Sequence, residues 1–162
     1  MDSPTVPPHR VIDVYPYRLA PAGHIEWLLL RRSPGTLYAG SWRMVGGKVA
    51  PGETGWRAAL RELHEETGRH PVRAWVLPSV NAFYEWQEDR LTLAPAFAAE
   101  LDADPILNQE HDSFCWLRLE DAAARLAWPE QQRLIRLADN LLRGTALPPA
   151  LELPPAGDPP AG

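Results

Sequence analysis

Apolar and polar residues alternate along several stretches of the chain, a pattern typical of strands with one face in a hydrophobic core. In the first half of the sequence, the alternation predicts strands at residues 11–19, 25–31 and 43–49, with a loop at 33–41. Pro21 and Gly23 lie between the first two strands, which predicts a hairpin there. In the second half, the alternation predicts strands at residues 72–78, 82–88, 91–101 and 114–119.

Helical spacing of apolar residues replaces this alternation in three places. After Thr54, a favourable N-cap, one side of a predicted helix carries Trp56, Ala59, Leu60, Leu63 and Thr67. Two further helices are predicted at 120–126 and 129–144, the second starting at Pro129 and ending near Gly144. Strands interleaved with helices predict a layered α/β or α+β domain, and the spacing alone leaves its topology open.

Chain length and proline content predict three segments. A chain of 162 residues suits one domain with a full core. Residues 1–10 are rich in proline and are predicted to be loose, and residues 11–144 form the domain. Residues 145–162 contain six prolines and little else that can pack, so we expect this tail to be disordered.

Net charge and cysteine content narrow the possible partners and the compartment. The net charge of −5 argues against a general binder of nucleic-acid polymers, which needs a basic face, but allows a nucleotide substrate. The single cysteine, Cys115, excludes an intrachain disulfide and fits a reducing cytoplasm. No stretch approaches 18 apolar residues, so we expect a cytoplasmic protein without a membrane partner. The sequence does not distinguish a monomer from a homodimer.

Three glutamates lie within about one turn of the first predicted helix. Glu62, Glu65 and Glu66 are spaced i, i+3 and i+4, so their carboxylates share one helix face. Without a cation these like charges repel one another, whereas Mg²⁺ or Mn²⁺ prefers such oxygen ligands and also bridges substrate phosphates. A solvated acidic face without a metal is the alternative interpretation.

Further residues at fixed spacing around these glutamates carry a family resemblance. The pattern is formed by Gly47, Glu53, Arg61, Glu62, Leu63, Glu65, Glu66 and Gly68. It resembles the Nudix box, and it departs from the usual box only at Arg69, where an aliphatic residue is common. The resemblance implies the Nudix fold, an α/β/α sandwich around a mixed β-sheet, over roughly residues 11–144.

The resemblance also implies roles for individual residues. Metal ligands are expected from Glu62, Glu65, Glu66 and the carbonyl of Gly46, with one glutamate serving instead as the base that activates water. Glu53 and Arg61 are expected to pair and hold the loop against the helix. Many family members add a distant carboxylate, for which Glu110 is the candidate and Asp112 the alternative. Glu110 can equally be an ordinary surface acid, and His111 either an acid–base group or a solvated loop histidine.

Nudix enzymes hydrolyse a nucleoside diphosphate linked to a further group. The segments around Val45, Glu110–His111 and Trp128 are similar to family branches that cut dATP, dihydroneopterin triphosphate or oxidised purine triphosphates. They favour hydrolysis of a (deoxy)nucleoside triphosphate to monophosphate and pyrophosphate. The alternatives are a diphosphate-linked nucleotide (dinucleoside polyphosphate, ADP-ribose or nucleotide sugar) or a nucleotide-binding module without catalysis.

A nucleotide also needs an aromatic or apolar slot and a few polar groups. Arg43 is a candidate for phosphate binding, and Asn81 for reading a base edge. The candidates for base stacking are Phe83, Trp86 and Trp116, although packing within the fold explains each of them equally well.

Overall fold

The computed structural model describes residues 10–144 and 147–155. Within them the strands are β1 (Val11–Leu19), β2 (Ile25–Arg32), β3 (Trp42–Arg43), β4 (Val45–Lys48), β5 (Arg73–Glu85), β6 (Arg90–Glu100) and β7 (His111–Leu117). The helices are α1 (Gly55–Thr67), α2 (Leu119–Arg125) and α3 (Pro129–Arg143), followed by the 3₁₀ helix η1 (Pro149–Leu151). None of the helices in this described part is both long and apolar enough to cross a bilayer.

The seven strands form one mixed sheet in the order β3-β2-β1-β6-β5, with β4 added beside β1 and β7 beside β2. Only the β1–β6 pair is parallel among the described pairs. β1 pairs with β2 at its end, from Tyr17 to Leu19, and with β4 at its beginning, from Val11 to Val14. β1 and β2 therefore diverge towards the beginning of β1, and the short strand β4, which contains Gly46 and Gly47, pairs with β1 there.

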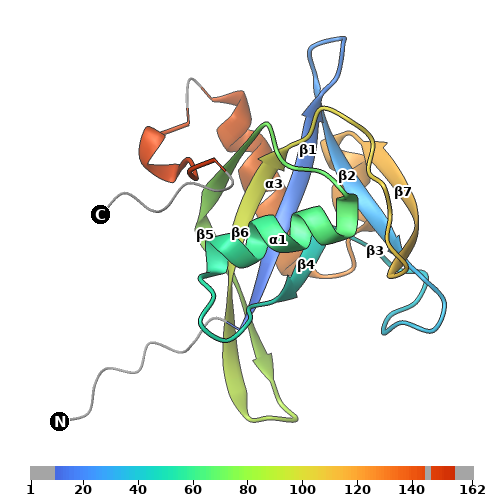
Figure 1. Cartoon of the computed structure of the whole chain (residues 1–162), viewed down its shortest axis with the longest axis vertical. Helices are drawn as coiled ribbons and strands as arrows, with labels where there is room; N and C mark the ends of the chain where they lie inside the picture. Colours follow the sequence, from blue (N-terminus) through green and yellow to red (C-terminus); the bar gives the residue numbers. More distant parts are fainter. Residues whose placement is uncertain (1–9, 145–146, 156–162) are drawn as a thin grey trace.

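Each face of the sheet carries its own hydrophobic core, and helices cover both faces (Figure 1). On one face, Tyr15 and Tyr17 of β1 pack with Leu134 and Ile135 of α3. On the other face, Ile12 and Val14 of β1 pack with Ala59 and Leu63 of α1. This alternation follows from the two-residue period of a strand. The layered α/β/α arrangement predicted from the sequence is confirmed.

Three strand boundaries differ from the prediction. The two strands predicted at 72–78 and 82–88 are one strand, β5, which ends at Glu85, and its pairing with β6 shifts between Val76 and Val80. Pro78 lies in the shifted stretch, where its missing N–H is tolerated. The predicted strand at 43–49 is divided between β3 and β4, because β3 pairs with β2 whereas β4 pairs with β1. The last strand starts earlier than predicted, at His111.

Part of the C-terminal tail is ordered against the edge of the sheet. The Leu153 N–H donates to the Ala74 carbonyl at 2.8 Å, and Glu152 lies 3.3 Å from Arg73 in an ion pair. Leu147 and Leu153 also pack against the two cores. The predicted disorder is therefore wrong for residues 147–155, where a few apolar side chains cover the open edge of β5. The other predicted loose residues, 1–9, 145–146 and 156–162, lie outside the described part of the chain.

Candidate active site

Helix α1 presents the three glutamates in three different environments. Thr54 lies at the N-cap position, although its side chain makes no capping hydrogen bond, and Gly68 ends the helix with φ of 65°. The buried Ala59 and Leu63 fix the helix on the sheet. As a result Glu66 is 2% exposed, the Glu62 side chain is 13% exposed and the Glu65 side chain is 53% exposed.

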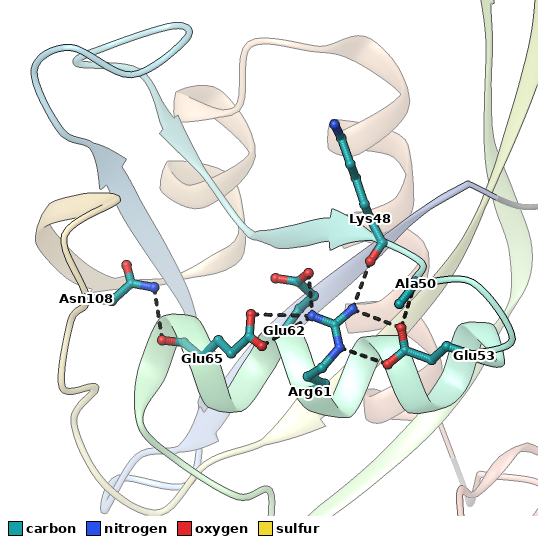
Figure 2. Close-up of polar contacts among 7 residues, drawn as sticks. All are labelled: Lys48, Ala50, Glu53, Arg61, Glu62, Glu65 and Asn108. Carbon is teal, nitrogen blue, oxygen red and sulfur yellow. Dashed lines mark hydrogen bonds and ion pairs between the residues drawn. The ribbon is translucent and has the colours of Figure 1, made fainter.

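Arg61 joins the helix to the loop that precedes it (Figure 2). Its Nε and Nη2 donate to the two carboxylate oxygens of Glu53 at 2.8 and 2.9 Å, and Nη2 also donates to the Lys48 carbonyl. Its Nη1 donates to Glu62 Oε1 at 2.9 Å and to Glu65 at 3.3 Å. The hydrogen bonds from Arg61 lower the pKa of Glu53. Arg61 thus fixes both the loop and the direction of the Glu62 side chain.

Glu66 is a buried carboxylate with an unsatisfied oxygen. Its Oε2 is buried without a hydrogen-bond partner among the described residues. Burial raises the pKa of Glu66 to about 8, and the nearby positive charge of Arg43 only partly opposes the increase. Burial also raises the pKa of Glu62, against the opposing effect of Arg61. Glu66 thus has no ion-pair partner among the described residues, whereas at Glu62 the effect of burial on the pKa exceeds that of the Arg61 ion pair.

The two glycines of β4 allow charged side chains to lie close to the strand. A Cβ atom at Gly47 would lie 2.1 Å from Glu62 Cδ, so only glycine leaves room for this carboxylate. A Cβ atom at Gly46 would lie 2.8 Å from Arg43 Nη2. Gly46 and Gly47 thus allow Arg43 and Glu62 to approach the strand from its two sides.

The oxygen donors of this site fit a divalent metal ion. Glu66 is a buried oxygen ligand without an ion-pair partner among the described residues, and burial raises the pKa of Glu62 despite Arg61, so a hard cation would stabilise both carboxylates. Within the described residues, no group of three or more His, Cys, Asp or Glu side chains is arranged around a common point. Arg61 holds Glu62 and Glu65 at present, and the more exposed Glu65 can exchange this contact by side-chain rotation.

Residues 110–112 have environments that the sequence did not indicate. The Glu110 side chain is 52% exposed and lies 4.0 Å from Arg32, and its charge contributes to the raised pKa of Glu66. Asp112 instead accepts a hydrogen bond from Arg31 at 2.8 Å. His111 is 3% exposed, and neither ring nitrogen has a partner in the described part of the chain. Burial lowers its pKa to about 4, so the interpretation as a solvated loop histidine is wrong.

The candidate substrate-binding residues do not converge. Arg43 lies close enough to Glu66 to influence its pKa, and no side-chain hydrogen bond of Arg43 occurs within the described residues. Asn81 is buried, whereas Phe83 and Trp86 are exposed on β5 and in the turn after it. Trp116 lies in β7, which pairs with β2 and is remote from β5 in the sheet order. Its indole N–H donates to Asp104, and its ring packs under Arg18. A single base cannot contact Trp116 together with Phe83 or Trp86.

Sequence reasoning missed Asp13, a buried acid in β1. Asp13 is 6% exposed and accepts a hydrogen bond from Asn81 at 2.9 Å. A signal was present, because Asp13 is two residues before Tyr15 and four before Tyr17 and so shares their core-facing side of the strand.

We predict that the stability of the metal-free protein depends on the ionisation of Glu66. The folded pKa of Glu66, about 8, exceeds the ordinary value of 4.5. The stabilisation that depends on protonated Glu66 is therefore complete below pH 4.5 and is lost as the pH rises through 8. Between these values, the unfolding free energy should fall by at most about 1.4 kcal/mol per pH unit relative to Glu66→Gln. Chemical denaturation of both proteins at pH 5.5 and 8.5 measures this difference. Parallel pH profiles would contradict the assignment.

A family model connects this geometry to known proteins. The model described as the NUDIX domain matches residues 8–138, which is most of the chain. The chain belongs to the Nudix family. Members of the family are hydrolases of phosphoanhydride bonds and generally use divalent metal ions, so this Nudix protein is a hydrolase acting on diphosphate-linked substrates.

Individual relatives differ in name and in length. A bis(5′-nucleosyl)-tetraphosphatase (asymmetrical) of Caenorhabditis elegans is 31% identical over 126 residues, covering 76% of this chain and 89% of that protein. An octanoyltransferase of Myxococcus xanthus is 34% identical over 114 residues, covering 68% of this chain. The match spans only 31% of that longer protein. The crystal structure of a C. elegans Ap4A hydrolase binary complex has a TM-score of 0.65 and 27% identity, covering 82% and 98% of the two chains.

Proposed function

We propose that this Nudix hydrolase cleaves a dinucleoside polyphosphate of the bis(5′-nucleosyl) tetraphosphate type, with Mg²⁺ as its metal and Mn²⁺ as a substitute. The similarity to the asymmetrical tetraphosphatase of C. elegans supports this substrate over a nucleoside triphosphate. The proposal reverses the order of the two substrate classes predicted from the sequence, while the reaction at a phosphoanhydride bond stays the same. Asymmetrical cleavage would give one nucleoside triphosphate and one monophosphate.

The observation that carries the proposed reaction is the buried and unpartnered Glu66 carboxylate next to Glu62. Glu62, Glu66 and the carbonyl of Gly46 would hold the metal, which leaves Glu65 as the glutamate that acts as the base. When bound, a divalent metal neutralises phosphate charge and lowers the pKa of its bound water. Arg61 supports the arrangement by fixing Glu62 and, through Glu53, the preceding loop.

The remaining roles follow from exposure and charge. Glu65 is more than half exposed, and we assign it the acceptance of the proton from the attacking water. Arg43 lies against Gly46 and lowers the pKa of Glu66, and it has no side-chain hydrogen bond in the described residues, so its guanidinium is available for a substrate phosphate. Glu110 is a further candidate ligand near Glu66 and Glu62.

A hydrolysis panel with product identification tests the proposed substrate. It comprises a dinucleoside tetraphosphate, ordinary and 8-oxo-purine nucleoside triphosphates, ADP-ribose and a nucleotide sugar, each with Mg²⁺ and with excess EDTA. We expect the highest kcat/KM for the dinucleoside tetraphosphate, with triphosphate and monophosphate as products. Release of pyrophosphate from a nucleoside triphosphate at a higher kcat/KM would contradict the proposal and favour nucleoside triphosphates as the substrate class. Binding without turnover of any compound would support a non-catalytic module.

A further inference from the structure

A second polar group lies on the α3 side of the sheet, outside the cluster of glutamates. Asp13 is 6% exposed, Asn81 is 8% exposed and Tyr15 is fully buried. Asn81 Nδ2 donates to Asp13 Oδ2 at 2.9 Å. All three residues lie among core side chains, where polar groups normally have hydrogen-bond partners.

The hydrogen-bonding capacity of this group is only partly used. The Tyr15 hydroxyl is buried without a partner among the described residues. Within the same part of the chain, no hydrogen bond reaches Asp13 Oδ1. The pair therefore retains an acceptor at Asp13, and the Tyr15 hydroxyl can supply a donor. A polar ligand would satisfy both groups, which are costly to leave unpaired in a core.

This group adjoins the candidate active site through β4. Asp13 is directly opposite Gly46 in the β1–β4 pairing, and its Oδ1 would lie 3.7 Å from a Cβ atom at Gly46. The next residue, Gly47, lies against the Glu62 carboxylate. Arg43 lies close to both Asp13 and Tyr15, since its charge affects the pKa of each. A ligand with phosphates near Glu62 and Arg43 can therefore extend across the glycines to Asp13.

We propose that Asp13, Asn81 and Tyr15 read the base of the nucleotide and favour one with an exocyclic amine next to an unprotonated ring nitrogen, as in adenine. In this arrangement the amine donates to Asp13 Oδ1, and the Tyr15 hydroxyl donates to the ring nitrogen. Hypoxanthine presents a carbonyl and a ring N–H at the same positions, so both hydrogen bonds are lost and the carbonyl oxygen faces a carboxylate. This inference rests on the proposed function, because it assumes a nucleotide at the glutamates.

The test compares matched adenine and hypoxanthine substrates. We expect the wild type to hydrolyse diadenosine tetraphosphate with a kcat/KM at least about tenfold above that for diinosine tetraphosphate. Asp13→Asn can keep the bond from Asn81 while placing an amide N–H₂ where Oδ1 lies. The adenine preference should then disappear or reverse. Asp139→Asn is the matched control, because Asp139 is also buried and binds the Trp27 side chain on the same side of the sheet.

A second variant avoids the risk that a change at Asp13 disrupts folding. Tyr15→Phe removes only a hydroxyl that has no partner in the described structure, so thermal stability should be kept. We expect it to lower kcat/KM severalfold for the adenine substrate and to leave the hypoxanthine substrate nearly unchanged. A wild type without base preference would overturn the inference. So would a preference that is the same in the wild type, Tyr15→Phe and folded Asp13→Asn.

Binding measurements separate failure of this inference from failure of the proposed function. Calorimetry with ADP and IDP, without metal, compares the two bases independently of turnover. If no compound is hydrolysed, the proposed function fails, and tighter binding of ADP that is lost in Tyr15→Phe would still support the base-reading group. Equal affinities for ADP and IDP in the wild type would overturn the base-reading group even if dinucleoside tetraphosphates are hydrolysed.

Discussion

Replacing Glu66 by glutamine is expected to lower kcat by about a thousandfold or more, without loss of folding. Glutamine has nearly the same shape as the protonated side chain that the buried site favours, with its pKa near 8. It lacks the negative charge needed to hold a divalent metal. Metal catalysis contributes several kcal/mol to stabilisation of the transition state, and about 1.4 kcal/mol corresponds to a factor of ten in rate. Steady-state kinetics at saturating Mg²⁺ and substrate measure the loss.

Glu88→Gln is the matched control for this prediction. Glu88 is an exposed residue in the turn between β5 and β6, so the same chemical change there should leave kcat within about twofold. Circular dichroism and thermal unfolding show whether Glu66→Gln remains folded. A folded Glu66→Gln protein with at least a tenth of the wild-type kcat would remove Glu66 from the set of essential metal ligands.

Replacing Gly47 by alanine is expected to impair both stability and activity. The new Cβ atom would lie 2.1 Å from Glu62 Cδ, so either β4 or the Glu62 side chain must move. The displaced atoms are the end of a flexible side chain that Arg61 holds, so we expect the unfolding free energy to fall by about 1 kcal/mol, the lower end of the range for overpacking. A displacement of Glu62 by about an ångström is enough to lower kcat/KM by about a hundredfold. Denaturant titration and kinetics measure the two effects separately.

A double variant identifies the cause of the Gly47→Ala effect. Glu62→Asp shortens the opposing side chain by one methylene, so adding it to Gly47→Ala should recover stability without restoring activity. Gly144→Ala provides a control at a glycine remote from the glutamates, at the end of α3. If the double variant is no more stable than Gly47→Ala, the contact with Glu62 does not explain the loss.

The spacing of the sequence predicted the position of α1 and the common face of its three glutamates. It did not predict how different their environments are. The exposure of each glutamate depends on how α1 packs on the sheet, which buries Glu66 and leaves Glu65 more than half exposed. Similarly, Gly47 was identified as part of the family pattern, but its contact with Glu62 depends on the approach of β4 to α1. Long-range packing of this kind has no periodic signature along the chain.

The errors at His111 and in the tail have the same origin. Asn108 to Asp112 are polar and read as a loop, but β7 begins at His111, opposite Arg32, where the pairing with β2 is irregular. This position buries the imidazole. In the tail, six prolines suggested disorder, whereas Leu153 reaches the edge strand β5 and bonds to Ala74. Local composition did not indicate that His111 pairs with β2 or that the tail binds the edge of β5.

The substrate-binding residues were the least predictable part of the site. Exposed or strand-forming aromatic residues were natural candidates, but the sheet order separates Trp116 from Phe83 and Trp86. The group closest to the glycines instead contains Asp13, an acid within an otherwise apolar strand. A buried acid in an apolar alternation is a useful signal in its own right, because ionised groups are rarely buried without a function or a partner.

Binding of Mn²⁺, followed by electron paramagnetic resonance, tests most directly whether the glutamates of α1 form a metal site. The signal of free Mn²⁺ falls as the ion binds, so a titration gives the affinity without any assumption about the substrate. We expect the wild type and Glu88→Gln to bind Mn²⁺ equally, and Glu66→Gln to bind at least about tenfold more weakly. Equal affinities in all three proteins would place the metal elsewhere and contradict the account of the active site.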